Sequence, residues 1–203
     1  QGHEPSGALA TKYKLADKLV LAKIRDRFGG QIRYFISGSA ALNKDVALWF
    51  SAVGMPVLEG YGLSESSAAA SVNRPYLGAN QAGTVGWPLP GTEFKLGEDD
   101  ELLVKGPGVM QGYWNLEEET SRVLVDGWFH TGDLGVCHAD GYVEIRDRLK
   151  DIIISGGENI YCAEVENVLF GHPSITEAAI IGRADEKWGE VPVAVVVLAE
   201  GVA

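Results

Sequence analysis

Hydrophobic residues recur at helical spacing near the start of the chain. Over 12–28, apolar side chains every three or four residues predict an amphipathic helix. Two glycines at 29–30 would end this helix. The apolar run 32–37 then predicts a buried strand, which leads into a turn of small residues at 38–41.

The next stretch repeats this order of elements. Asn43 is expected to open a second helix and Gly54 to stop it, with apolar positions at helical spacing between them. A strand over 56–58 follows and leads into the polar turn 59–66. This is a strand–helix–strand unit, and open α/β sheets place ligands where such strands end.

Short apolar runs broken by Gly, Pro and Asp-Gly occupy 83–146 and predict hairpins in a β-barrel-like arrangement. One amphipathic helix interrupts them, with Asn115 as its expected N-cap and Glu118 as the capping partner. Further on, an apolar run at 152–155, a helix over 163–170 and two strands predict a small α/β unit.

The fold class is therefore α/β. We predict an α/β segment over 1–82, a β-rich segment over 83–146, a linker at 147–150, and a small α/β unit over 151–203.

Composition limits the function. A chain of 203 residues with 46% hydrophobic and 22% charged residues can bury a real core. The net charge of −11 argues against a broad nucleic-acid or anionic-membrane surface, but a locally basic pocket could still bind a small anion. Two cysteines are too few for a disulfide scaffold, and a reducing cytoplasm is the expected location.

No stretch approaches the roughly 18 apolar residues of a membrane helix, so we expect no transmembrane segment. The missing initiator Met and an end just after an apolar run suggest a piece of a longer polypeptide, whose remainder would be a partner.

Three polar, glycine-rich segments lie in order along the chain, EGYGLSES at 59–66, GWFHTGDLG at 127–135 and RDRLKDIIISGGENIY at 146–161. With SGSAAL at 37–42 and GPGVMQGYWN at 106–115, they resemble the adenylate-forming superfamily, and most of all its fatty acyl-CoA synthetases. The resemblance implies that 1–146 is the C-terminal part of a large AMP-binding domain and that 151–203 begins its small domain.

Two segments would flank an adenine. Gly38, Ser39 and Ala40 have little side-chain bulk, so a flat purine can lie against their backbone. In the segment Glu59-Gly60-Tyr61-Gly62, the tyrosine offers an aromatic face and the glutamate offers acceptors for the exocyclic amine.

Ser64 and Glu65 suit the phosphates. A hydroxyl can donate to a phosphate oxygen, and a single carboxylate with phosphates is a common Mg²⁺ site. The resemblance gives these residues catalytic roles, with Glu65 as the metal ligand, although relatives usually have Thr at the position of Ser64. Alternatively, Ser64 and Glu65 simply start a helix.

Asp133 can accept hydrogen bonds from both hydroxyls of a ribose, although an Asp in such a segment can also just form a turn. By resemblance, Asp133 binds the ribose and Arg148 contacts the same sugar and the nearby phosphate. Lys150 has the position of the hinge between the two domains. After domain rotation, Ser155, Gly156, Gly157 and Glu158 would line the tunnel for the pantetheine arm of CoA.

The implied reaction is activation of a fatty or other carboxylic acid by ATP and Mg²⁺, followed by acyl transfer to CoA. Two alternatives stay open: a ligase that loads a carrier protein, and a nucleotide-binding fragment without catalysis. The family's Lys-containing phosphate loop and its catalytic lysine do not occur in these residues. We therefore expect that the chain alone does not complete adenylation.

Overall fold

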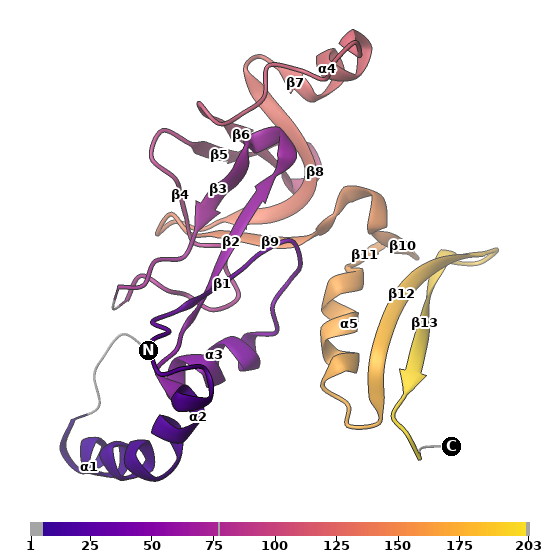
Figure 1. Ribbon diagram of the computed structural model, residues 1–203. Coiled ribbons are helices and arrows are strands. Elements are labelled where there is room, and N and C mark those ends of the chain that lie inside the picture. Colours follow the sequence, from indigo (N-terminus) through magenta and orange to yellow (C-terminus); the bar gives the residue numbers. More distant parts are fainter. Residues whose placement is uncertain (1–5, 77, 202–203) are drawn as a thin grey trace.

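The computed structural model describes residues 6–76 and 78–201, so the outermost residues of the predicted first and last segments lie outside the described residues. Within the described part, the strands form three sheets with helices beside them (Figure 1). The predicted mixed α/β class is confirmed. None of the described helices is long and apolar enough to cross a bilayer.

The predicted first helix is present and is continuous through a π-helical turn. It comprises α1 (Gly7–Ala16), the π-helical segment Asp17–Leu21 and α2 (Ala22–Arg27). A guanidinium N–H of Arg25 donates to the carbonyl oxygen of Val53 at 2.8 Å, which ties this helix to α3 (Lys44–Val53).

Helix α3 begins and ends where the sequence predicts. The side chain of Asn43 accepts hydrogen bonds from the first-turn N–H groups of Asp45 and Val46. Gly54 ends the helix in the left-handed conformation, with φ of 88°. Helix α3 connects β1 (Phe35–Ser37) to β2 (Val57–Leu63), and these two strands are parallel.

The prediction of a buried strand over 32–37 is wrong in length and in burial. Strand β1 has three residues, and Ile36 in its centre is 72% exposed. The reason is that only the Phe35 face is covered, because Phe35 packs edge to face against Phe28 and Phe50 with ring centroids 5.6 and 5.5 Å apart.

The segment 59–63, predicted as part of a turn, instead forms most of β2. The chain turns only at the 3₁₀ segment Ser64–Ser66, and returns as the antiparallel strand β3 (Ala68–Val72), which pairs with β4 (Trp87–Pro88). A Cβ on Gly62 would overlap the carbonyl oxygen of Ala68. The glycine therefore allows two strands to approach closely rather than allowing a turn.

The β-rich middle is an antiparallel sheet in the order β5-β6-β8-β7, with β9 on the second half of β8. The strands are β5 (Glu93–Leu96), β6 (Glu101–Lys105), β7 (Leu124–Val125), β8 (Trp128–Cys137) and β9 (Val143–Arg148), with a 3₁₀ turn at Glu98–Asp100. Its core contains Leu102, Val104, Phe129, Leu134 and Val143, each at most 2% exposed.

The predicted N-cap of the helix in this region is wrong. Helix α4 (Glu117–Val123) has Leu116 at its N-cap position and no side-chain cap. Asn115 has a left-handed backbone with φ of 55°, a conformation that Asn tolerates better than most residues. Its side chain therefore caps no helix, and the turn before α4 uses its backbone instead.

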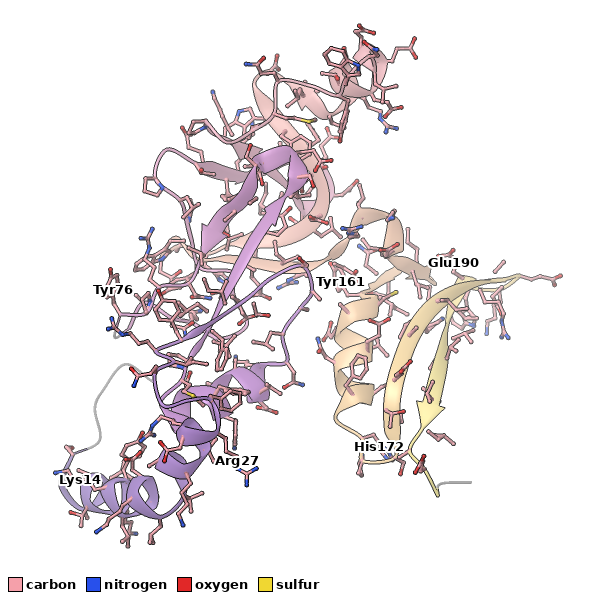
Figure 2. All side chains as sticks on the ribbon, in the orientation of Figure 1. Lys14, Arg27, Tyr76, Tyr161, His172 and Glu190 are labelled. Carbon is pink, nitrogen blue, oxygen red and sulfur yellow. The ribbon has the colours of Figure 1, made fainter. Side chains whose placement is uncertain are left out.

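The C-terminal unit packs one helix on a sheet in the order β11-β10-β13-β12 (Figure 1). It contains a 3₁₀ turn at Leu149–Asp151, β10 (Ile153–Ser155), β11 (Glu158–Ile160), α5 (Cys162–Phe170), β12 (Ile175–Asp185) and β13 (Gly189–Leu198). Ile153, Cys162 and Ile180 form its small buried core. Many apolar side chains of β12 and β13 remain exposed (Figure 2).

Candidate functional site

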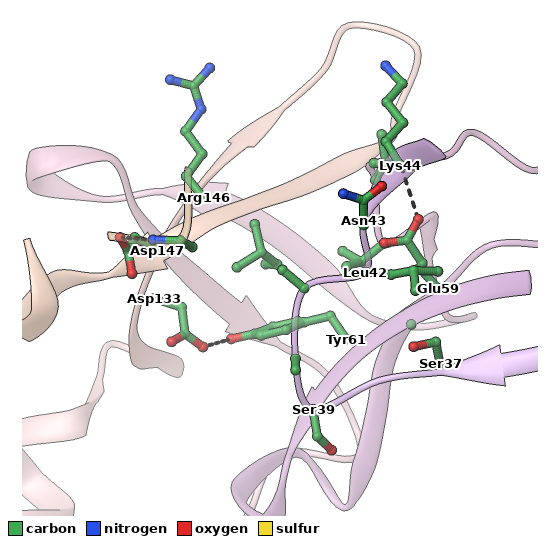
Figure 3. A pocket seen from close by; sticks show the side chains of 18 of the residues that line it. Ser37, Ser39, Leu42, Asn43, Lys44, Glu59, Tyr61, Asp133, Arg146 and Asp147 are labelled. Carbon is green, nitrogen blue, oxygen red and sulfur yellow. Dashed lines mark hydrogen bonds between the residues drawn. The ribbon is translucent and has the colours of Figure 1, made fainter. Parts of the chain in front are cut away.

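A cavity of about 620 Å³ lies where the β1–β4 sheet, the β5–β9 sheet and the C-terminal unit meet (Figure 3). Most of its wall comes from β2, the segment between β1 and α3, residues 83–85, the end of β9 and Asp133 in the middle of β8. Helix α5 closes one side with Ala163 and Asn167. The segments that meet here are far apart in the sequence.

Tyr61 and Asp133 form the centre of the cavity. The phenol of Tyr61 donates to Oδ2 of Asp133 at 2.6 Å, between residues 72 positions apart in the chain. Asp133 is only 6% exposed. Burial raises the pKa of this carboxyl, and the Tyr61 hydrogen bond and the Arg148 charge oppose that shift. Burial and the neighbouring Asp133 likewise raise the pKa of Tyr61.

Arg148 reaches the same carboxylate from the neighbouring strand. It lies directly opposite Asp133 in the β8–β9 register. Its Nε is 3.5 Å from Oδ1 of Asp133, and its side chain is 60% exposed. The guanidinium is therefore held near a buried carboxylate while most of its donors remain open to a ligand.

Glu59 is the second buried carboxylate of the cavity, at 8% exposure. One of its oxygens accepts from the backbone N–H of Gly83 at 3.0 Å. Burial raises its pKa, and the Gly83 hydrogen bond opposes the shift. One cavity wall thus carries a fixed acceptor group.

Most of the predicted adenine segment lines this cavity, namely Ser39, Ala40, Glu59, Gly60, Tyr61 and Gly62. Gly38 does not line it. A Cβ on Gly38 would lie 3.3 Å from the carbonyl oxygen of Gly60, so this glycine faces β2.

Ser64 and Glu65 lie just past Leu63, which lines the cavity, but they do not line it themselves. The hydroxyl of Tyr113 donates to Oε1 of Glu65 at 2.8 Å. Among the described residues, no group of three or more His, Cys, Asp or Glu side chains is placed to hold a metal. A single carboxylate fits Mg²⁺ only where phosphate oxygens complete the coordination.

The remaining predicted residues lie outside the main cavity. Lys150 lines a second pocket of about 380 Å³ between β9 and the C-terminal unit. Ser155 and Glu158 pair with each other where β10 and β11 meet, and Gly156 and Gly157 form the turn between them. The backbone N–H of Gly156 donates to the carbonyl oxygen of Trp188 at 2.8 Å. In this arrangement the turn contributes nothing to the lining of the main cavity.

Several residues that line the cavity were not predicted from the sequence. Asn43, Lys44 and Asp45 bring the start of α3 to the cavity, and Arg146 and Asp147 precede Arg148 on β9. In Figure 3, Lys44 and Arg146 extend away from Tyr61 and Asp133. All five residues lie within a few positions of a predicted site residue, and this closeness in sequence could have indicated that they line the cavity. Helix α5 gave no such signal, because its place in the wall depends on how the C-terminal unit packs.

The chain belongs to the family of AMP-binding enzymes. Residues 5–114 match the AMP-binding enzyme family, and residues 164–203 match the C-terminal domain of AMP-binding enzymes. The resemblance to adenylate-forming enzymes is thereby confirmed.

The similar proteins are ligases of different acids. A feruloyl-CoA synthase from Amycolatopsis sp is 44% identical over 181 residues, covering 84% of this chain and 37% of that protein. A long-chain-fatty-acid–CoA ligase from Bacillus subtilis is 44% identical over 182 residues, covering 84% of this chain and 32% of that protein. The chain thus spans well under half the length of these relatives.

The fold is also similar to a solved structure. The o-succinylbenzoate CoA synthetase of Bacillus subtilis, in complex with its acyl-adenylate intermediate, aligns with a TM-score of 0.81 and 36% sequence identity. The alignment covers 90% of this chain and 40% of that protein.

Proposed function

We propose that this chain forms the adenylate-binding part of an AMP-forming acid–thiol ligase, which activates a carboxylic acid with ATP and transfers it to CoA. The observation that carries the proposal is the meeting of Tyr61, Asp133 and Arg148 in one cavity of a chain that belongs to the AMP-binding enzymes. The similarity to several CoA ligases supports the acid–thiol class.

An adenylate suits the chemistry of the cavity. Its volume of about 620 Å³ lies within the range of small-molecule sites. Asp133 would accept from the ribose hydroxyls, and Arg148 would approach the sugar and the α-phosphate. The Tyr61 ring would lie against the adenine, and Glu59 would face its amine. On a chain of net charge −11, the exposed guanidinium of Arg148 would supply positive charge for the phosphate at this cavity.

The proposed reaction has two halves. A carboxylate oxygen of the acid attacks the α-phosphorus of ATP. Pyrophosphate leaves, and the product is an acyl-adenylate. The CoA thiol then attacks the acyl carbon, and AMP leaves. Mg²⁺, held by Glu65 and the phosphates, would neutralise charge on the triphosphate. Ser64 would donate to a phosphate oxygen.

We propose that the C-terminal unit serves the second half of the reaction, the transfer of the acyl group to CoA. Lys150 would be the hinge, since it lies between β9 and β10, which can stay rigid while its backbone angles change. Rotation would bring the turn at Ser155, Gly156, Gly157 and Glu158 to the cavity, where the pantetheine arm of CoA would enter.

Because the motifs resemble those of fatty acyl-CoA synthetases, the proposed acid is a fatty acid. The proposed location of the enzyme is the cytoplasm. The named relatives act on feruloyl, long-chain fatty and o-succinylbenzoyl substrates, so the wider class is a carboxylic acid. Loading of a carrier protein and nucleotide binding without catalysis stay as alternatives. Adenylation by the chain alone is still expected not to occur.

Calorimetry with AMP and 2′-deoxy-AMP tests the adenylate site directly. The chain is expected to bind AMP, and Asp133→Asn should weaken this binding about 10- to 100-fold, as expected for the loss of a charge-assisted hydrogen bond. Because the ribose diol is the proposed contact, the wild type should prefer AMP over 2′-deoxy-AMP, and the variant should lose that preference.

Asp126→Asn is the matched control, because Asp126 is exposed and does not line the cavity. It should bind AMP as the wild type does. Failure of the wild type to bind AMP, or an Asp133→Asn variant that binds with unchanged affinity, would overturn the proposal.

A further inference from the structure

Strand β8 is irregular just before Asp133. In its pairing with β6, Glu101 lies opposite Leu134 and Leu103 lies opposite His130. Two residue steps along β6 therefore face four along β8, and the extra length forms a bulge over 131–133. Such bulges re-aim a side chain out of the regular pleat.

The bulge depends on a left-handed residue. Gly132 has φ of 70°, and no atom lies near the position of an added Cβ. Its constraint is therefore conformational rather than steric. Backbone N–H groups within such a bulge do not pair with the neighbouring strand, so each needs another acceptor.

Glu101 on β6 supplies that acceptor and contacts two residues of β8. Its Oε1 accepts from the backbone N–H of Gly132 at 2.8 Å, and its Oε2 is 2.8 Å from Nδ1 of His130. The Glu101 side chain is 14% exposed. One nearly buried carboxylate thus fixes the residue before the bulge and the residue in its centre.

Thr131 completes the arrangement from inside the bulge. Its hydroxyl donates to the carbonyl oxygen of Leu102 at 2.7 Å and accepts from the backbone N–H of Asp133 at 3.0 Å. The backbone of Asp133 is thereby held next to β6. Glu101 itself does not line the cavity, so any effect it has on a ligand acts through this backbone.

We propose that Glu101 is a positioning residue of the nucleotide site, whose carboxylate holds the β8 bulge that presents Asp133 to the ligand. This inference rests on the proposed function, because it assumes that Asp133 contacts the ribose. It adds a residue outside the glycine-rich motifs, from a different strand.

The test combines AMP calorimetry with NMR hydrogen exchange of the Gly132 amide. Glu101→Ala should speed exchange at Gly132 and weaken AMP binding about tenfold or more, because small displacements of a contacting group are costly. It should also reduce the preference for AMP over 2′-deoxy-AMP. A variant that only lost stability would keep that preference in its folded fraction.

Two further variants keep the test decisive if Glu101→Ala folds poorly. Glu101→Gln keeps an acceptor for Gly132 and should restore most of the affinity and the preference. Glu98→Ala removes an exposed glutamate three residues earlier and should change nothing.

The outcomes separate this inference from the proposed function. If the wild type binds no AMP, the adenylate site itself is refuted, and Gly132 exchange still reports whether Glu101 holds the bulge. If AMP binds and Glu101→Ala speeds Gly132 exchange without changing AMP affinity or preference, the positioning role is refuted. Unchanged Gly132 exchange in Glu101→Ala would refute it as well.

Discussion

Two glycine-containing segments of this chain, 59–62 and 155–158, use glycine in different ways. Gly60 and Gly62 lie in β2, where the lack of a side chain lets β3 approach, and Gly62 has no room for a Cβ. Gly156 and Gly157 form an exposed turn with φ of 61° and 89°, and nothing lies within 4 Å of a Cβ built on Gly157. Gly62 is therefore required for space and Gly157 for backbone conformation, whereas a Cβ on Gly156 would also lie 2.6 Å from the Trp188 ring.

The two segments also differ in how their polar groups are paired. Around β2, the functional groups are already paired in a buried cavity, as Tyr61 with Asp133 and Glu59 with Gly83. The polar groups of the turn at 155–158 are mostly exposed. Glycine content alone therefore does not tell a close strand contact from a loop.

The largest expected effect is that of Gly62→Ala. Its added methyl group would overlap the carbonyl oxygen of Ala68, and relief requires that β2 and β3 separate. We expect a loss of more than about 3 kcal/mol in the free energy of unfolding, above the usual overpacking range. Urea denaturation followed by circular dichroism measures it.

Gly157→Ala is the matched variant in the other segment. Its cost should be only about 1–2 kcal/mol, that of placing a Cβ in a left-handed backbone. Equal losses for the two variants would show that the two glycines do not differ in the way the structure indicates.

A smaller effect is expected for Tyr61→Phe. This change removes the hydroxyl that donates to Asp133 and leaves a buried carboxylate oxygen without that partner. Unfolding free energy should fall by about 1 to 2 kcal/mol. Tyr76→Phe, at a residue that is 69% exposed, should cost nothing measurable in the same denaturation experiment. Equal stability of Tyr61→Phe and wild type would mean that the hydrogen bond contributes no net stability.

The smallest effect has the opposite sign. Burial raises the pKa of Asp133 above its ordinary 3.8, so the folded chain holds this proton to higher pH than the unfolded chain does. The stability from the neutral carboxyl is full below pH 3.8 and is lost as pH rises through the native pKa. Asp133→Asn should therefore unfold at a higher denaturant concentration than wild type at pH 7, although it binds AMP less well.

Glu158, in the exposed turn at 155–158, provides a control for the pH dependence of Asp133→Asn. The advantage of Asp133→Asn should shrink as the pH is lowered toward 3.8, whereas Glu158→Gln should leave stability unchanged throughout, because Glu158 is exposed. An Asp133→Asn variant that is less stable than wild type at pH 7 would mean that the pairing with Arg148 outweighs burial.

Elements defined by neighbouring residues could be predicted from the sequence. Asn43 and Gly54 cap α3 through contacts within a few positions, and both were predicted correctly. Asn115 was not, because an Asn before a helix can either cap it or take a left-handed backbone, and the local sequence is compatible with both.

The sequence by itself determined which side chains carry the chemistry, because a carboxylate, a phenol and a guanidinium have the same hydrogen-bonding capacity in any fold. The tertiary structure decided that Asp133 stands on a strand bulge, that Tyr61 donates to it across 72 positions, and that α5 closes the cavity while the turn at 155–158 lies outside. These features depend on which strands pack together. Such contacts form between distant segments, so no local pattern specifies them.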